Sequence, residues 1–168
     1  GEEREIGFGA EWPLKGTLTV PDGGNGPFPL VVLVHGSGPQ DRDETLGPNR
    51  PFRDIARDLE RAGVATLRYD KRTRAHGARV AKLNDYSLDE EVIDDAVLAG
   101  KYLSDNLLVD SSMIVVVGHG FGGTLAHRIA KASDGVFSAV IMVGSTALSY
   151  EDYLLGHSNL SSHTADEL

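Results

Sequence analysis

Residues 113–123, which read Met-Ile-Val-Val-Val-Gly-His-Gly-Phe-Gly-Gly, contain the change of pattern that decides the fold. The aliphatic run at 113–117 is typical of a strand that is buried on both faces of a parallel sheet. A glycine-rich run follows, and residues 124–132 then place Leu125 and Ile129 at helical spacing. The stretch therefore predicts a buried strand that turns sharply into a helix.

The same alternation of strand and helix extends over most of the chain. A helix is expected to begin near Asn49, with Pro51 in its first turn and Gly63 after its end. A second helix is expected from Ser87, where Glu90 completes a capping box. The expected strands lie at residues 30–34, 64–69, 113–117 and 137–143, and residues 5–20 are expected to form an antiparallel hairpin.

The order of these segments predicts the architecture. Alternating strands and helices give a parallel sheet with right-handed crossovers. We therefore expect an α/β fold, a three-layer sandwich whose mostly parallel sheet carries an N-terminal antiparallel hairpin. One domain is expected over residues 1–168, with the hairpin at 1–21, the core βα units at 30–145 and a polar tail at 146–168, where a missing lid would begin.

Composition and charge narrow the classes of function. The chain has 168 residues, a formal net charge of −9 and no cysteine. The acidic charge argues against a nucleic-acid surface, and the lack of cysteine excludes disulfides and cysteine-based zinc sites. The basic cluster at 68–74 is short and is expected to be a solvated loop. No apolar run reaches the ~18 residues of a membrane helix, so we expect a soluble chain, with the compartment, cytoplasmic or secreted, left open.

Two glycine-rich loops follow buried strands, at residues 35–38 and 118–123. Ligands of open α/β sheets bind beyond the carboxyl ends of the strands, so both loops are candidates for a site. The second loop lies at a strand–turn–helix junction, which is the context of the nucleophile elbow, Gly-x-Ser-x-Gly. Glycines are expected there because the turn is tight and the helix packs closely on the strand.

These loops, with further blocks in the same order, resemble the α/β-hydrolase superfamily, particularly its bacterial esterase-like and acyl-thioesterase-like members. The blocks are residues 35–45 (His-Gly-Ser-Gly-Pro-Gln-Asp-Arg-Asp-Glu-Thr), 47–49 (Gly-Pro-Asn), 68–72 (Arg-Tyr-Asp-Lys-Arg) and the elbow at 118–123. Together they extend the resemblance over roughly residues 16–155, which corresponds to the N-terminal half of the superfamily's fold.

The resemblance implies a mechanism in which an elbow serine attacks an acyl carbonyl, a histidine takes its proton and an acid orients the histidine. Two backbone N–H groups meet the developing oxyanion, and they match Ser37 and Phe121 here. The elbow tip is Gly120, which has no side chain and so cannot form a covalent acyl intermediate. The remaining glycines of the two loops are expected to shape their turns: Gly36, Gly38, Gly118 and Gly122.

The acid and the histidine of the triad are not evident in this sequence. In the superfamily they follow the seventh and eighth strands, whereas about six strands are predicted here. His157 and His163 lie in the polar tail, behind no predicted strand, and we do not expect them to be catalytic. Ordinary serine-dependent ester hydrolysis is therefore not expected. Whether Gly120 is natural or an engineered replacement stays open.

The other histidines of the two loops have structural interpretations. His119, before the elbow tip, is expected to pack or to line the pocket, and acid or base chemistry is the alternative. His35 is expected to be structural, with its ring hydrogen-bonded in the loop. No two histidines have the i, i+4 spacing of a helical zinc site, so neither a metal nor another cofactor is predicted.

Three functions remain open at this point. The first is a disarmed relative of enzymes that cleave carboxylic esters or thioesters, and the second is a pseudoenzyme that binds a small acyl ligand in the same pocket. The third is a non-hydrolytic enzyme in which His119 acts as acid or base on a bound carbonyl. The expected partners are a small acyl ester or thioester, no nucleic acid, and a second copy of the chain through the apolar edge from Phe137 to Val143.

Overall fold

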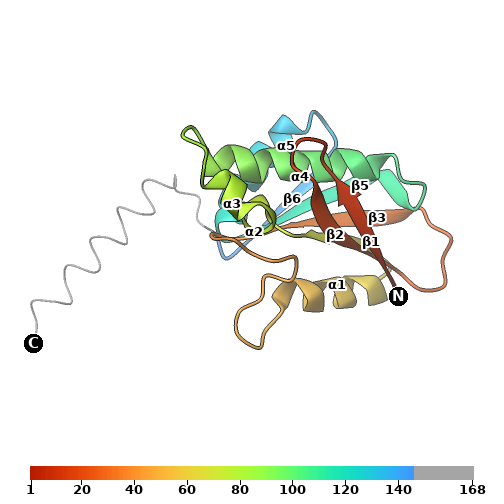
Figure 1. Ribbon diagram of the computed structural model, residues 1–168. Coiled ribbons are helices and arrows are strands. Elements are labelled where there is room, and N and C mark those ends of the chain that lie inside the picture. The colour runs from red at the N-terminus through yellow and green to blue at the C-terminus, as the bar shows by residue number, and fades with distance from the viewer. Residues whose placement is uncertain (146–168) are drawn as a thin grey trace, which may run out of the picture.

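The protein has a six-stranded mixed sheet with helices on both faces (Figure 1). The computed structural model describes residues 1–145. The strand order is β1-β2-β4-β3-β5-β6, in which β2 is antiparallel to both of its neighbours and the remaining pairs are parallel. The strands are β1 (Glu2–Phe8), β2 (Leu14–Val20), β3 (Phe28–Val34), β4 (Ala65–Tyr69), β5 (Val109–His119) and β6 (Ala139–Val143).

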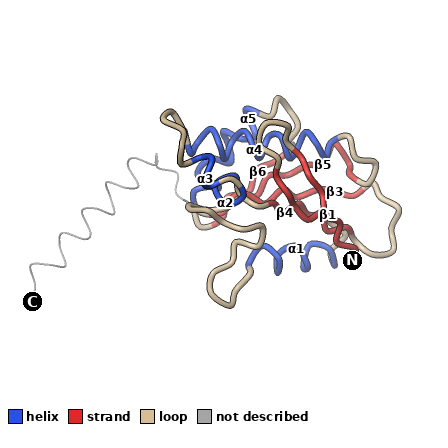
Figure 2. Tube along the Cα trace, in the orientation of Figure 1, coloured by secondary structure: helices blue, strands red, loops and turns tan. Residues whose placement is uncertain are grey.

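The helices form the two outer layers. Helix α1 (Pro51–Arg61) lies on one face of the sheet, and α4 (Leu88–Ser104) and α5 (Phe121–Ala132) lie on the other (Figure 2). Two short helices, α2 (Arg72–Ala75) and α3 (Gly77–Val80), follow β4. The predicted three-layer α/β sandwich with an N-terminal hairpin is confirmed. Within residues 1–145, no helix is both long and apolar enough to cross a membrane.

The central strand β3 is buried on both faces, which explains its unbroken aliphatic run. Leu30 and Val32 belong to the core that the sheet forms with α4 and α5. Val31 and Leu33 point to the opposite face and pack with Phe52 of α1. Because each buried aliphatic side chain stabilises the fold by about 1.5–3 kcal/mol, both layers depend on this strand.

The register of β3 and β5 brings the two predicted site loops together. These strands are parallel neighbours, and Val34 is paired with Gly118. The carboxyl ends of parallel strands meet at one edge of a sheet. The loop at 35–38 and the elbow at 118–123 therefore lie side by side.

Several expected boundaries are shifted in the structure. The hairpin starts at Glu2 and α5 starts at Phe121, both earlier than expected. The last strand starts at Ala139, because Phe137 belongs to the core, where its ring lies 2.7 Å from the position of a Cβ on Gly100. The expected apolar edge from Phe137 to Val143 is thereby corrected to β6. The tail at 146–168 lies outside the described residues.

Candidate active site

The elbow tip, Gly120, joins β5 to α5 in a backbone conformation with φ 54° and ψ −119°. Its N–H donates to the Val143 carbonyl at 2.9 Å, and its carbonyl accepts the Thr124 N–H at 3.0 Å. At such a positive φ, a residue other than glycine is strained by on the order of 1–3 kcal/mol. A strand, a tip with positive φ and a helix together have the geometry of a nucleophile elbow.

Close packing explains two of the other elbow glycines. A Cβ on Gly118 would overlap the Gly122 carbonyl, and a Cβ on Gly122 would lie 2.6 Å from the Val34 carbonyl oxygen. By contrast, a Cβ on Gly120 would have its nearest non-neighbouring heavy atom, the Gly36 Cα, at 3.6 Å. The elbow is therefore sterically closed on either side of the tip and open at the tip itself.

The glycines of the first loop have different physical roles. Gly38 has φ 86°, and the position of its Cβ is surrounded by open space. Gly36 has no such backbone requirement, but its Cβ would lie 3.1 Å from Glu44 Oε1. Gly38 therefore permits the turn, and Gly36 permits the close approach of a carboxylate.

Two cavities meet at the predicted oxyanion residues. One has a volume of about 400 Å³ and is lined in part by Gln40, Glu44 and His119. The other, of about 380 Å³, lies toward α3 and is lined mainly by apolar groups. Ser37 and Phe121 line both cavities. The structure thus brings the two predicted oxyanion residues to one place.

A carboxylate that the motifs did not single out lies at the centre of the site. The Glu44 side chain is 2% exposed, and its Oε1 accepts the Gly36 N–H at 2.6 Å. Its Oε2 lies 2.9 Å from Nδ1 of His119. Glu44 also has φ 51°, a conformation that is uncommon for residues other than glycine. The pair Glu44–His119 therefore connects the first loop to the elbow.

The loop that carries Glu44 is ordered by its own side chains. Asp41 Oδ1 accepts the N–H groups of Asp43 and Thr45 at 3.1 and 2.9 Å. The Thr45 hydroxyl donates to Asp41 Oδ2 at 2.7 Å. These bonds hold a compact turn that directs the Glu44 side chain inward.

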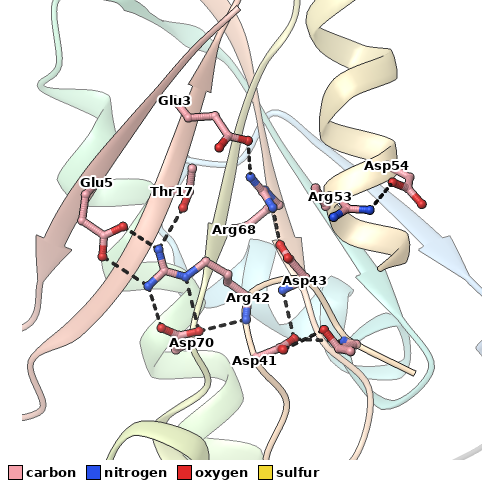
Figure 3. Close-up of polar contacts among 11 residues, drawn as sticks. Glu3, Glu5, Thr17, Asp41, Arg42, Asp43, Arg53, Asp54, Arg68 and Asp70 are labelled. Atoms are coloured by element: carbon pink, nitrogen blue, oxygen red, sulfur yellow. Dashed lines mark hydrogen bonds and ion pairs between the residues drawn. The ribbon is translucent and has the colours of Figure 1, made fainter. Parts of the chain in front are cut away.

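Arg42 fixes the same loop to the sheet (Figure 3). Its guanidinium donates to both carboxylate oxygens of Asp70, to both of Glu5 and to the Thr17 hydroxyl, at 2.6 to 3.3 Å. The Arg42 N–H adds a further bond to Asp70 at 3.0 Å. The loop is thus tied to β1, to β2 and to the end of β4.

Arg68 makes a second connection, which corrects one expectation. Its side chain is 3% exposed and pairs with Asp43 of the loop and with Glu3 of β1 (Figure 3). Lys71 is also buried, and its Nζ donates to the Gly36 carbonyl at 3.0 Å. The expectation of a solvated loop at 68–74 is therefore wrong, because acidic groups and carbonyls from distant segments partner these cations.

His35 is structural in the geometry of the site, although its Nε2 has no hydrogen-bond partner among the described residues. Its ring packs against Phe52 and, edge-on, against Tyr69. Burial, together with the nearby Lys71 charge, lowers the pKa of His35 to about 4, so its ring is neutral at pH 7. Packing rather than a role in chemistry accounts for this histidine.

The acidic and basic residues after β4 also have ordering roles. Arg72 donates to both carboxylate oxygens of Asp95 on α4, at 3.1 and 2.6 Å. Together with the Arg42–Asp70 pair, these bonds order the segment that follows β4. Among residues 1–145, no group of three or more His, Asp or Glu side chains is arranged to hold a metal ion.

Comparison with known proteins decides the family. Residues 56–163 match the prolyl oligopeptidase family. The chain belongs to this family. Over 153 residues it is 41% identical to esterase EstD of Thermotoga maritima, and the alignment includes 91% of this chain and 34% of EstD. The chain therefore spans about a third of the length of this curated relative.

Solved structures of α/β-hydrolases share the fold of this prolyl oligopeptidase family member. The α/β-hydrolase GrgF from Penicillium sp. sh18 superposes with a TM-score of 0.67 at 20% identity, over 96% of this chain and 53% of GrgF. Est1E from Butyrivibrio proteoclasticus gives 0.61 at 19% identity, over 84% of this chain and 51% of Est1E. These likenesses confirm the predicted α/β-hydrolase architecture.

The site combines predicted and unpredicted residues. The structure brings together Ser37, Phe121, Gly120 and His119, all of which the motifs pointed to. The sequence did not predict a role for Glu44 in the site. Its only signal was its place within the block at 35–45, and no motif singled it out. The tail histidines, His157 and His163, lie outside the described residues.

Proposed function

We propose that this chain binds the acyl group of a carboxylic ester or thioester at the elbow without forming an acyl-enzyme. The carbonyl oxygen accepts hydrogen bonds from the backbone N–H groups of Ser37 and Phe121. The observation that carries the proposal is that these two residues line both cavities. When the carbonyl lies between Ser37 and Phe121, the acyl chain of the ester extends into one cavity and its leaving group into the other.

The elbow geometry supports binding, and the residue at its tip has no side chain that could form an acyl-enzyme. Phe121 is the first residue of α5, and the N-terminal end of a helix attracts negative charge. Such an end stabilises the oxyanion of a tetrahedral species. Gly120, however, offers no oxygen to attack the carbonyl, so the acyl group is not transferred to the elbow tip.

The two cavities suggest how the ligand is oriented. Val80, Ala81 and Leu88 contribute to the lining of the cavity toward α3, which suits an apolar acyl chain. The other cavity contains Gln40, Glu44 and His119, which suit a polar or charged leaving group. The name of the relative EstD, an esterase, agrees with a ligand of this class.

Binding is tested with the monoanion of butyl methylphosphonate, a tetrahedral oxyanion mimic that needs no serine. In the ¹⁵N-labelled chain, the amide resonances of Ser37 and Phe121 should shift most on titration. Ser37→Pro removes the N–H donor and should weaken binding about tenfold, the loss expected for a hydrogen bond to a charged group. Ser37→Ala keeps the donor and is the matched control.

Two outcomes would contradict the proposal. One is a titration in which neither amide shifts. The other is equal loss of affinity in Ser37→Ala and Ser37→Pro, which would place the hydroxyl rather than the backbone N–H in contact with the ligand.

A further inference from the structure

We propose that Glu44 and His119 form a general-base pair that drives direct attack of water on the carbonyl at the elbow. The chain would then hydrolyse activated esters slowly and in one step, with no covalent intermediate. This inference rests on the proposed binding mode. It assigns to His119, the pocket-lining residue, a catalytic role and to Glu44 a positioning role.

Glu44 lies close to one nitrogen of the His119 imidazole. Glu44 Oε2 lies 2.9 Å from Nδ1 of His119, although the two atoms do not have the geometry of a hydrogen bond. The carboxylate beside Nδ1 favours a proton on that nitrogen, which leaves the electron pair on Nε2. Nε2 lies on the side of Gly144, at 3.4 Å from the position of its Cβ, and Gly144 lines the same cavity as Gly120. The basic nitrogen is therefore presented to the cavity.

The Glu44 side chain is held in place by a hydrogen bond to one of its oxygens. Oε1 accepts the Gly36 N–H, and Oε2 faces His119, while the carboxylate itself is 2% exposed. The positive φ of Glu44 is a strained conformation of the kind that clusters at functional sites. A carboxylate that is buried, strained and hydrogen-bonded to the Gly36 N–H is more than a solvated loop charge.

Glu44 interacts with a cation, Lys71, besides the imidazole of His119. Lys71 lies beyond Gly36, with its Nζ bonded to the Gly36 carbonyl, and its charge attracts that of Glu44. The other acids of the loop have partners of their own, since Asp41 is bonded to Thr45 and Asp43 to Arg68. A negative charge on Glu44 thus stabilises the imidazolium that forms when His119 takes a proton.

The reaction balances without any other co-reactant than water. Nε2 of His119 takes one proton from a water molecule, and the water oxygen forms a bond to the carbonyl carbon. The resulting oxyanion then collapses, the bond from carbon to the leaving oxygen or sulfur breaks, and the leaving group takes the proton back from Nε2. Oxyanion binding and general-base catalysis each accelerate such a step even where the nucleophile is lost.

The test follows hydrolysis of 4-nitrophenyl butanoate by the wild type, His119→Gln and Glu44→Gln. Loss of the base should lower kcat by about 10²-fold in His119→Gln. Added imidazole should partly rescue the hydrolysis rate of His119→Ala. His127→Gln, which changes an exposed histidine on α5, is the matched control and should behave as the wild type.

A double-mutant cycle separates positioning from a general structural effect. Glu44→Gln should lower kcat in the wild type but have little further effect in the His119→Gln background, because it acts through the imidazole. Intact mass spectrometry during turnover should find no acylated chain. Equal rates in the wild type and His119→Gln, with phosphonate binding retained, would overturn this inference and leave the proposed binding function standing. A wild type that does not bind the phosphonate would overturn both this inference and the proposed binding function.

Discussion

Gly120 has a backbone conformation that suits glycine and a position with room for a side chain. Its φ is 54°, and a Cβ at this position would have the Gly36 Cα as its nearest non-neighbouring atom, at 3.6 Å. At this residue the backbone strain of a substitution can therefore be measured without a steric clash. Replacing the glycine changes the backbone energy without creating a steric clash.

We expect Gly120→Ser to lower the free energy of unfolding by about 1–3 kcal/mol, the strain of a non-glycine residue at positive φ. Urea denaturation at equilibrium measures the change. Gly77→Ser is the control, because Gly77 also has open space around its Cβ position but no positive φ. A variant Gly120→Ser that is more stable than the wild type would show that the tip is unstrained.

His35 makes the stability of the fold depend on pH. Burial and the Lys71 charge lower its folded-state pKa to about 4, below the ordinary value of 6.5. The contribution of the neutral His35 ring to the free energy of unfolding is full above pH 6.5 and is lost as the pH falls toward 4. The loss occurs because the unfolded chain binds the proton at a higher pH than the folded chain does. Between pH 7 and pH 5 this removes about 2 kcal/mol of unfolding free energy.

The variant His35→Gln should lack that part of the pH dependence. Asp95 acts in the opposite direction, since burial raises its pKa to about 6 despite the bond from Arg72, and its effect is common to both proteins. Unfolding free energies of the two proteins at pH 7 and pH 5 therefore isolate His35. If the unfolding free energies of the wild type and His35→Gln change equally with pH, His35 is not the source of this pH dependence.

At the scale of elements, β6 is the feature with the clearest consequence. Among residues 1–145, it pairs with β5 on one side and with no strand on the other. Val140, Ile141, Met142 and Val143 are each between 37% and 50% exposed. An apolar strand with a row of open hydrogen-bonding groups is a template for pairing with another chain.

We therefore predict that the chain self-associates by antiparallel pairing of β6 about a two-fold axis. Ile141→Lys should shift the equilibrium toward monomer, because a charge at an edge opposes pairing. Light scattering over a dilution series measures the association. Met113→Lys alters an equally exposed residue of β5, away from this edge, and should leave it unchanged. A wild type that is monomeric at high micromolar concentration would refute the prediction.

At the scale of the whole molecule, ion pairs join the hairpin, the first loop and β4. Arg42 and Arg68 are the centres, and their partners come from residues 3 to 70 of the chain (Figure 3). Arg42 lies in the loop that carries Ser37 and Glu44. The conformation of this loop thus depends on contacts with the N-terminal hairpin. The hairpin is remote from the elbow in sequence.

Arg42→Ala should lower the free energy of unfolding by about 1–3 kcal/mol and speed amide exchange in residues 36–45, because Asp70 and Glu5 lose their shared partner. Arg42→Lys should rescue this only in part, since an ammonium cannot bridge two carboxylates as a guanidinium does. Arg61→Ala, which breaks an exposed pair with Asp58, should change stability by less than about 0.5 kcal/mol. Unchanged exchange in Arg42→Ala would show that the loop is ordered without the network.

Local pattern was enough to predict the layers of the fold and the position of the elbow. The aliphatic run at 30–34 marks the central strand β3, because a strand covered on both faces carries apolar side chains at every position. The run at 113–117 marks β5, but the expected burial on both faces is wrong there, since Met113 is 49% exposed and Val115 and Val117 are only partly buried. Glycines at 118 and 122 mark the elbow, because backbone approaches there leave no room for a Cβ. Ser37 and Phe121 then followed from the resemblance of these loops to the α/β-hydrolases.

Tertiary structure alone decided which charges are buried and what they contact. The Glu44–His119 pair joins residues from different loops, and Arg68 and Lys71 are buried because partners from β1 and the first loop satisfy them. In the sequence, all four look like ordinary polar side chains of loops and strand ends. Apolar periodicity is a local property that each element displays by itself. The burial of a charge depends on partners that only the packed fold brings within a hydrogen bond's reach.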